Sequence, residues 1–418
     1  MKDNKNIPKH WQLKKLGDVC KLKNGYAFKS DNYESQGVPI IRISDINGGI
    51  VSSQKAVRVK ANEDYENYLV EDNDILVAMS GATTGKFGIY KSKEKAYQNQ
   101  RVGKFKILDD SVLNNEFLFH QINSLKRQIE KDAYGGAQPN ISSIKIEQMQ
   151  IVLPPLSEQQ ALVAKIEELL SELENGKQQL LTAQQQLKVY RQSLLKWAFE
   201  GKLTNKKVKD GELPKGWKWV KSGELVSFVT SGSRGWAKYY SDKGAIFIRI
   251  TNMNFDTLEL DLRAEKIQYV NPPSNSEGIR TKVQEGDFLF SITGYLGMFA
   301  IAPKLENAFV NQHVCLCRPK EGFNKKYVGY WISSRSGGIH HLNKNQKGAV
   351  KAGLNLDDLK TFPVPLCSPE EQQLIVSELE SKLTVCDKIE ETISQSLQQA
   401  ETLRQSILKK AFEGKLVK

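Results

Sequence analysis

The chain has few cysteines and no long apolar run. Only five of its 418 residues are cysteines, and none has a paired C-x-x-C spacing, so the sequence predicts neither a disulfide framework nor a zinc site. No run of about eighteen apolar residues occurs. The polar start MKDNKNIPKHWQ also lacks the apolar stretch of a signal peptide. We expect buried free thiols and a soluble, cytoplasmic protein that does not enter a membrane.

Catalytic and cofactor motifs are also missing. The stretch NPPS at Asn271 is similar to the adenine-holding loop of amino-methyltransferases, but Ser274 replaces the aromatic residue and no Gly-rich cofactor loop follows a strand. SGATTGKF is one residue too short between Gly81 and Gly85 for a phosphate loop, and Phe87 replaces the magnesium-binding hydroxyl. The histidines show no metal or triad spacing. The sequence predicts no catalytic residue, no metal and no cofactor.

Positive charge is plentiful and unevenly distributed. Of the formal net charge of +12, residues 1–153 carry +5 and residues 204–366 carry +9, whereas residues 154–203 carry 0 and residues 367–418 carry −2. Two basic modules on near-neutral connectors are typical of a protein that binds a polyanion. A mild basic excess also occurs in proteins that bind no nucleic acid.

The chain is a tandem repeat. RQSLLKWAFEGKL from Arg191 recurs as RQSILKKAFEGKL from Arg404, and EQQ at Glu158 recurs at Glu371, both 213 residues later. Upstream, IPKHWQ matches LPKGWK, IRISDIN matches IRITNMN, DILVAMSG matches DFLFSITG, and QNQRV matches VNQHV. A period this long indicates duplicated domains. We name them head 1 (1–153), connector 1 (154–203), head 2 (204–366) and connector 2 (367–418).

Heads and connectors differ in expected structure. The heads have short β-branched or aromatic runs between Gly, Asn and Ser clusters, which predict mixed β-structure with one short helix near the end of each head. The connectors are rich in Glu, Gln, Lys and Leu, which predicts long helices. A heptad-spaced seam in both connectors predicts a coiled coil; its positions are Ile166, Leu173, Leu180, Leu187 and Leu194, and Leu379, Cys386, Ile393, Ala400 and Ile407.

The direction of helix pairing is left open by the seam alone. Antiparallel pairing would relate the two copies by a pseudo-twofold axis and place the heads at opposite ends of the pair, whereas parallel pairing would bring the heads together. Both helices end in AFEGKL, in which Gly201 and Gly414 suit the left-handed position after a helix.

Polar loops that follow the strands are the DNA-binding candidates. They mix basic, amide and hydroxyl side chains with Tyr and Trp, as groove edges and phosphates require, and they differ between the heads while the framework agrees. About half of them would be ordinary solvated loop surface. The candidates are Tyr26, Lys29, Ser30, Thr83, Thr84, Lys86, Tyr134 and Gln138 in head 1, and Ser233, Arg234, Trp236, Lys238, Tyr239, Tyr295, Lys344, Asn345, Gln346 and Lys347 in head 2.

Four polar residues recur inside the shared framework, namely Arg42 with Arg249 and Asn99 with Asn311. We interpret them as structural, because a residue present in both heads does not make the heads read different sequences.

These motifs resemble the specificity (S) subunits of type I restriction-modification systems over essentially the whole chain: P-K-x-W, R-I-[ST]-x-[IM]-N and NQ-x-V in each head, then EQQ and AFEGKL in each connector. The resemblance implies an α+β fold, with two mixed α/β target-recognition domains in a pseudo-twofold arrangement, separated by two long antiparallel helices that form a coiled coil. It also implies a non-catalytic subunit that binds double-stranded DNA and recruits two methyltransferase subunits and the restriction subunits. Each domain would read one half of a split target, and the unlike loops predict unlike halves.

The shared helix ends are the expected site for the methyltransferase, because two identical partners need equivalent surfaces. The candidates are Trp197, Phe199, Gly201, Phe412 and Gly414. An alternative is that the two phenylalanines only cap the coiled coil. For the whole chain, the competing hypothesis is a coiled-coil scaffold that binds proteins without DNA specificity.

Overall fold

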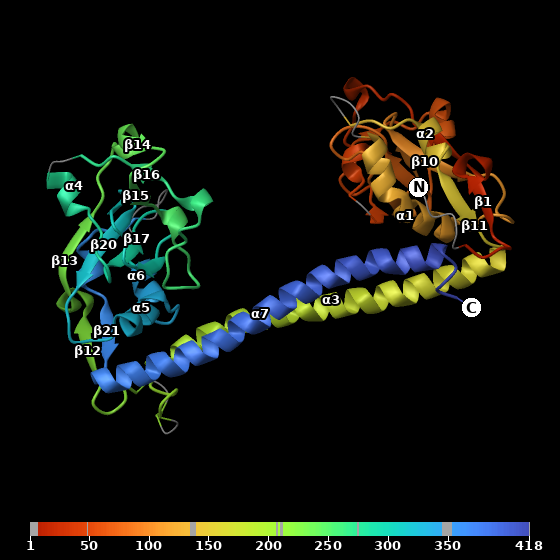
Figure 1. Cartoon of the computed structure of the whole chain (residues 1–418). Coiled ribbons are helices and arrows are strands. Elements are labelled where there is room, and N and C mark those ends of the chain that lie inside the picture. Colours follow the sequence, from red (N-terminus) through yellow and green to blue (C-terminus); the bar gives the residue numbers. More distant parts are fainter. Residues whose placement is uncertain are drawn as a thin grey trace. The chain divides into compact units, whose positions relative to one another are not determined.

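The computed structural model describes residues 7–47, 49–133, 139–205, 208–209, 212–273, 276–344 and 353–417. The chain forms two compact units, of which unit 1 contains Met1–Leu180 and Gln395–Lys418 and unit 2 contains Leu181–Ser394. Each unit therefore holds one head, the beginning of the connector helix that follows this head, and the end of the other connector helix (Figure 1). Within the described ranges, no helix is long and apolar enough to span a bilayer.

Head 1 is a small mixed α/β domain. One sheet has the order β2-β10-β7-β8-β4 and a second has the order β5-β3-β9-β6, while β1 pairs with β11. The strands are β1 (Gln12–Lys15), β2 (Cys20–Asn24), β3 (Val38–Ile41), β4 (Gly49–Val51), β5 (Arg58–Val59), β6 (Leu69–Val70), β7 (Ile75–Ala78), β8 (Phe87–Tyr90), β9 (Ala96–Gln98), β10 (Val102–Ile107) and β11 (Gln150–Leu153), and the helices are α1 (Asn115–Ala133) and α2 (Ser143–Glu147).

Head 2 repeats this plan. Its sheets have the orders β13-β20-β17-β18 and β14-β16-β15-β19, and β12 pairs with β21. The strands are β12 (Lys218–Lys221), β13 (Val226–Ser231), β14 (Tyr240–Ser241), β15 (Ala245–Ile248), β16 (Tyr269–Val270), β17 (Phe288–Ser291), β18 (Phe299–Ile301), β19 (Ala308–Val310), β20 (Val314–Pro319) and β21 (Pro363–Leu366), and the helices are α4 (Ser276–Arg280), α5 (Lys325–Ser333) and α6 (Gly338–Lys344).

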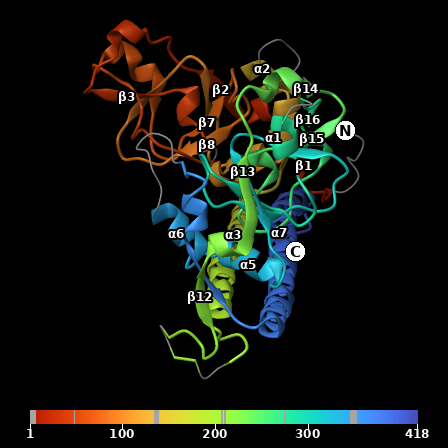
Figure 2. The same ribbon diagram turned by 90° about the vertical axis from the view of Figure 1, so that its left-hand side faces the viewer.

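The central strand of each head is buried at every position, and apolar except for Ser291 at the end of β17, because both of its faces are covered. In β7, Ile75 and Val77 pack with the α1 side of head 1, whereas Leu76 and Ala78 pack with residues of the second sheet such as Ile41. Strand β17 does the same in head 2, and α5 lies between its sheet and the connector helices (Figures 1 and 2). A strand buried on both faces is expected to be a continuous hydrophobic run rather than an alternating one.

The connectors form the helices α3 (Leu156–Phe199) and α7 (Pro369–Phe412). In unit 1, Leu170 lies near Arg404 and Leu180 near Ser396, so the two helix segments run antiparallel. In unit 2, Arg191 forms ion pairs across the helices with Asp387, at 2.5 Å, and Glu390, at 3.1 Å. The antiparallel pairing is thus present within each unit, and the expected α+β class is confirmed.

The heptad positions lie along this pairing. Ile166, Leu187, Leu194, Leu379, Cys386, Ile393 and Ile407 are buried, and Leu173, Leu180 and Ala400 are half-buried. In unit 1 the less buried positions line a groove of about 830 Å³ together with Gly176, where small side chains leave the two helices incompletely packed. The seam predicted from heptad spacing therefore matches the apolar face that the helices share.

The repeated sequence motifs attach each head to both helices. The indole of Trp11, from IPKHWQ, donates to Glu158 at the start of α3, and the indole of Trp217 donates to Glu371 at the start of α7. The side-chain oxygen of Gln159 accepts from the backbone N–H of Asn114 at 2.9 Å. Gln372 and Asn324 make the same bond at 2.8 Å in unit 2. The motifs recur because both units need the same joint.

The end of the other helix completes each joint. Phe412, at the end of α7, packs edge-to-face on Phe117 in head 1, and Phe199, at the end of α3, packs on Tyr327 and Trp331 in head 2. The phenol of Tyr327 donates to a backbone carbonyl at 2.8 Å, and its burial raises the pKa of the phenol, which keeps this donor protonated. Each connector helix therefore begins on one head and contributes its last turn to the core of the other.

Candidate nucleic-acid interface

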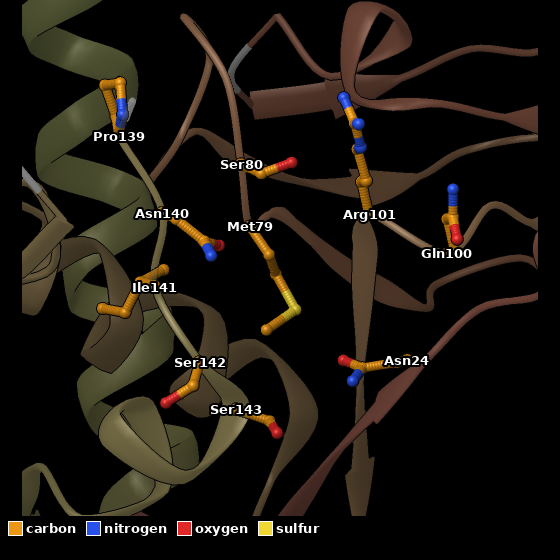
Figure 3. Close-up of a pocket in the computed structure, with 10 residues that line it drawn as sticks. All are labelled: Asn24, Met79, Ser80, Gln100, Arg101, Pro139, Asn140, Ile141, Ser142 and Ser143. Atoms are coloured by element: carbon orange, nitrogen blue, oxygen red, sulfur yellow. The ribbon is translucent and has the colours of Figure 1, made fainter. Parts of the chain in front are cut away.

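Three loop groups and one tight turn converge in head 1. They surround a polar cleft of about 550 Å³ that contains no acidic side chain (Figure 3). Asn24 ends β2, Met79 and Ser80 follow β7, and Gln100 and Arg101 form the turn between β9 and β10. The rest come from the segment before α2 and from its first residue. The complete lining is Asn24, Met79, Ser80, Gln100, Arg101, Pro139, Asn140, Ile141, Ser142 and Ser143.

Backbone hydrogen bonds hold these segments together. The N–H of Met79 donates to the carbonyl of Arg101, and the N–H of Ile141 donates to the carbonyl of Met79, each at 3.0 Å. The N–H of Gln100 donates to the carbonyl of Tyr26 at 2.8 Å. Because the contacts are between main-chain groups, the side chains around the cleft are free to vary without loss of the scaffold.

Head 2 builds the same scaffold with different side chains. Ile292 donates to the carbonyl of His313, and Leu354 donates to the carbonyl of Ile292, each at 3.0 Å. The bridge between Ser80 and Asn140 in head 1 has its counterpart in the bridge between Thr293 and Gly353. The equivalent positions therefore carry Ser80, Arg101 and Asn140 in head 1, and Thr293, His313 and Gly353 in head 2.

The head 1 candidates from the sequence fall into two groups. Lys29 and Ser30 are exposed, Tyr26 is exposed and packs on the ring of Tyr65, and Thr83 and Lys86 are half-buried. Thr84 is buried, and its hydroxyl is within hydrogen-bond distance of the carbonyls of Gly81, at 2.6 Å, and Pro139, at 3.0 Å. Its side chain therefore joins two loops from the inside. Tyr134 and Gln138 lie outside the described residues.

The head 2 candidates divide in the same way. Tyr295 and Arg234 are exposed, and Lys238 lies over the ring of the half-buried Tyr239 with its amine 5.0 Å from the ring centroid. Ser233, half-buried, accepts a hydrogen bond from Arg280 at 2.9 Å. Trp236 is buried and stacks on Phe247 with ring centroids 5.3 Å apart, so its indole is a core group. The side chain of Lys344, and all of Asn345, Gln346 and Lys347, lie outside the described residues.

The sequence interpretation passed over Arg101 and His313. Both belong to the shared motif NQ-x-V, which was assigned to the framework, and for Asn99 and Asn311 this assignment agrees with the geometry. Their side-chain oxygens accept from the backbone N–H of Arg101, at 3.5 Å, and of His313, at 3.0 Å. The signal that could have identified them is position x of NQ-x-V, the one position at which the two copies of this motif differ.

The expected partner-binding residues are mostly internal. Phe199 and Phe412 are 5% and 8% exposed and pack on aromatic residues of the heads, so their side chains serve the interior. Gly201 and Gly414 have positive φ angles of 74° and 67°, and a Cβ on Gly201 would lie 2.4 Å from Pro214. Trp197 is 40% exposed and packs edge-to-face on Tyr190.

Both helix ends also present the same charged cluster. In unit 2, Lys196 and Lys202 flank Glu200 at 3.7 and 2.6 Å. In unit 1, the corresponding residues Lys409 and Lys415 flank Glu413 at 3.8 and 2.6 Å. This cluster is a partly exposed feature that the two ends share. Over the described residues, no group of three or more His, Cys, Asp and Glu side chains could hold a metal ion.

Comparison with known proteins gives one family. The model of the type I restriction modification DNA specificity domain matches residues 8–183 and 214–399, one match for each repeat. The chain is 28% identical to the EcoBI specificity subunit of Escherichia coli, over 98% of this chain and 87% of the relative. It is 25% identical to the EcoKI specificity subunit of Escherichia coli (strain K12), over 98% and 90%. These relatives are named as specificity subunits, in agreement with the prediction of a non-catalytic subunit.

Solved structures show the same fold. A chain from work titled "Structural basis underlying complex assembly and conformational transition of the type I R-M system" aligns with a TM-score of 0.77 at 20% identity, covering 98% of this chain and 99% of that chain. The HsdS subunit from Thermoanaerobacter tengcongensis aligns with a TM-score of 0.60 at 20% identity, covering 98% of both chains. With two family domains that span most of its length, this chain belongs to the family of type I restriction-modification specificity subunits.

Proposed function

We propose that head 1 and head 2 read different half-sites of an asymmetric bipartite DNA target. The observation that carries this proposal is the equivalence of the two scaffolds: the same backbone contacts support Arg101 in one head and His313 in the other. Direct readout of bases depends on which side chains reach the groove. Equivalent scaffolds with unlike side chains support recognition of two unlike sequences, and a bipartite target made from them is not a palindrome.

The charge of the heads supports DNA as the ligand. The sequences of both heads are basic and those of the connectors are not, and the cleft of head 1 contains Arg101 without any acidic neighbour in its lining. Phosphate contacts supply most of the affinity of a DNA-binding protein, and contacts with base edges supply its specificity. On this proposal, α3 and α7, with 44 residues each, set the spacing between the half-sites.

The chain would act by bringing catalytic subunits to the target. Two methyltransferase subunits would bind at the helix ends, where Lys196, Glu200 and Lys202 are matched by Lys409, Glu413 and Lys415. A surface present twice suits two identical partners. The restriction subunits would join this complex. The phenylalanines of AFEGKL serve the partner indirectly, because they fix the helix end on which the charged cluster lies.

Long-read sequencing of methylated adenine in host DNA tests this function. DNA is compared from cells with the gene, without it, and with the gene restored on a plasmid, in a host that expresses the methyltransferase subunit. We expect a split motif with unlike halves to lose methylation on deletion and to regain it on restoration. An inverted-repeat motif contradicts the proposed asymmetry. Unchanged methylation, with the methyltransferase shown to be present, contradicts the function itself.

The scaffold alternative predicts a different result. A coiled-coil scaffold without DNA specificity would bind a protein partner but would not retain duplex DNA on a filter. Filter binding of the complex with random duplex and with the methylated motif separates the two, because only a DNA reader retains the motif better than the random sequence.

A further inference from the structure

Arg101 and His313 occupy the same place in the two heads. In each head, the residue accepts a backbone hydrogen bond from the residue that follows the central strand, namely Met79 or Ile292. In each head, its own N–H is held by the preceding asparagine of the NQ-x-V motif. The main chain at this position is therefore fixed in the same way in both heads, and only the side chain distinguishes them.

The side chain of Arg101 is available for a ligand. It is exposed, and within the described residues its guanidinium has no hydrogen bond or ion pair. The hydroxyl of Ser80, which lines the same cleft, is buried and likewise has no hydrogen-bond partner among these residues. In Figure 3, Met79 and Ser80 lie between the segment of Asn140 and the turn that carries Arg101. Among the described residues, the cleft lining thus contains a cation and a buried hydroxyl that both lack a hydrogen-bond partner.

The side chain of His313 is already engaged. One ring nitrogen, Nδ1, lies 2.6 Å from the hydroxyl of Thr293, and the other, Nε2, lies 2.8 Å from the amide nitrogen of Gln312. The hydroxyl that is unpartnered at Ser80 is therefore paired with the ring in head 2. The imidazole is short and fixed, and it has no five-donor fork with which to reach a base.

We propose that position x of the NQ-x-V motif determines base specificity, with Arg101 reading a guanine in the half-site of head 1. Arginine bonds O6 and N7 of guanine with two parallel N–H donors in the major groove. His313 does not make this contact, so the head 2 half-site differs at the corresponding base. A contact of Arg101 with a phosphate would carry no sequence information, and the binding test below separates it from a contact with a base. This inference rests on the proposed function.

The test is a set of variants of the full chain, expressed with the methyltransferase subunit and analysed by long-read sequencing of methylated adenine. Arg101→His and Arg101→Lys are expected to accept other bases at one guanine of one half-site, while the second half-site stays unchanged and reports that the protein is folded. Arg127→His, at an exposed position on α1 outside the cleft, is the matched control and should keep the wild-type motif.

Binding to short duplexes completes the test. Each duplex carries a different base at the affected position, and Arg101→Lys is expected to lower affinity for the guanine duplex on the order of tenfold and for the others much less. Equal losses for all four duplexes would identify a phosphate contact and overturn the inference. So would a motif unchanged in Arg101→Lys and Arg101→His, or a wild-type motif without guanine. Failure of the proposed function is distinct, because the wild-type chain would then direct no motif at all.

Discussion

The indole nitrogen of Trp11 lies 2.8 Å from Oε2 of Glu158, which accepts its hydrogen bond at the first turn of α3. The same joint in unit 2 joins Trp217 to Glu371 at 3.1 Å. Glu158 is also paired with His10, and these donors lower the pKa of its carboxyl group, with Trp11 as the larger cause. The tryptophan at the start of each head is thus bonded to the first turns of the connector helix that follows that head.

Trp11→Phe is expected to weaken the contact between head 1 and α3 without leaving a cavity. The ring is kept and the N–H is lost, so the free energy of unfolding should fall by about 1 kcal/mol, because Glu158 is partly exposed and can be rehydrated. Urea unfolding at neutral pH measures the change. Trp219→Phe is the matched control, because Trp219 is 53% exposed and a surface change of this kind costs under about 0.5 kcal/mol. Equal effects of the two variants would contradict a structural role of the indole donor.

The repeat and the heptads were sufficient to predict most of the architecture. A 213-residue offset that holds from EQQ to AFEGKL requires two equivalent connectors, and apolar residues seven apart require a shared seam. The sequence did not show which head receives which helix end. Phe412, near the end of the chain, packs on Phe117 in head 1, and a repeat has the same letters whether its parts pack within one copy or are exchanged.

Alanine substitutions at Gly176, inside α3, and at Gly201, just after α3, should change the stability of the fold in opposite directions. Gly176 lies inside the helix with open space where a Cβ would be, so Gly176→Ala should stabilise the chain by about 1 kcal/mol. Gly201 has a φ of 74° and a Cβ there would meet Pro214, so Gly201→Ala should destabilise by a similar amount or more. Thermal unfolding of the two variants checks both signs. A stabilising Gly201→Ala would rule out the left-handed C-cap.

Stability should fall between pH 6.5 and 4 because of His120. This side chain is buried on α1, and its pKa is lowered to about 4, mainly by burial and further by Arg404, against the opposing effect of Glu116. The unfolded chain takes up a proton near the ordinary value of 6.5, whereas the folded chain does so only near 4. The stabilisation is therefore complete above 6.5 and is lost as the pH falls, by about 3 kcal/mol in all.

His120→Leu provides the comparison for this effect. The leucine does not titrate, so the difference in free energy of unfolding between the variant and the wild type should change in favour of the variant by about 3 kcal/mol from pH 7 to pH 4. Chemical denaturation at several pH values gives both curves. If the two curves stay parallel, a group other than His120 is responsible for the acid sensitivity.

On the proposed function, Trp197 should not be needed at either of the two methyltransferase sites. It is exposed beside Tyr190, but the equivalent residue at the other helix end is Lys410, so the aromatic surface is present only once. Trp197→Ala is therefore expected to keep two methyltransferase subunits per chain, as measured by native mass spectrometry, because the charged cluster remains at both helix ends. Phe199→Ala is the contrasting variant, with an expected loss of about 3–5 kcal/mol of folding stability from a core cavity. Loss of one subunit in Trp197→Ala would contradict this expectation and place Trp197 in the partner surface.

The candidate DNA interface was only partly accessible from the sequence. The head 1 candidates came from loops near Asn24, Ser80 and Tyr134. Asn24, Ser80 and Asn140 line one cleft, but none of the described head 1 candidates does. Burial was not visible in the letters, which is why Thr84 and Trp236 were selected although their side chains serve the interior. Arg101 was missed for the opposite reason, because a recurring motif was assigned to the framework as a whole when one of its positions faces solvent.

Salt should weaken DNA binding strongly and to a similar extent for specific and random duplexes. Each lysine or arginine at a phosphate releases condensed counterions, so the logarithm of the binding constant falls linearly with the logarithm of salt concentration, by about 0.9 per contact. For roughly six to ten contacts the loss is about 10³- to 10⁵-fold between about 50 and 200 mM salt.

Fluorescence anisotropy of the complex with a target duplex and a scrambled duplex gives both slopes. Arg101→Lys should keep the wild-type slope, since its charge is unchanged and only the two-donor geometry is lost. An affinity that is insensitive to salt on both duplexes would contradict binding through the basic heads, because no other part of the chain carries an excess of positive charge.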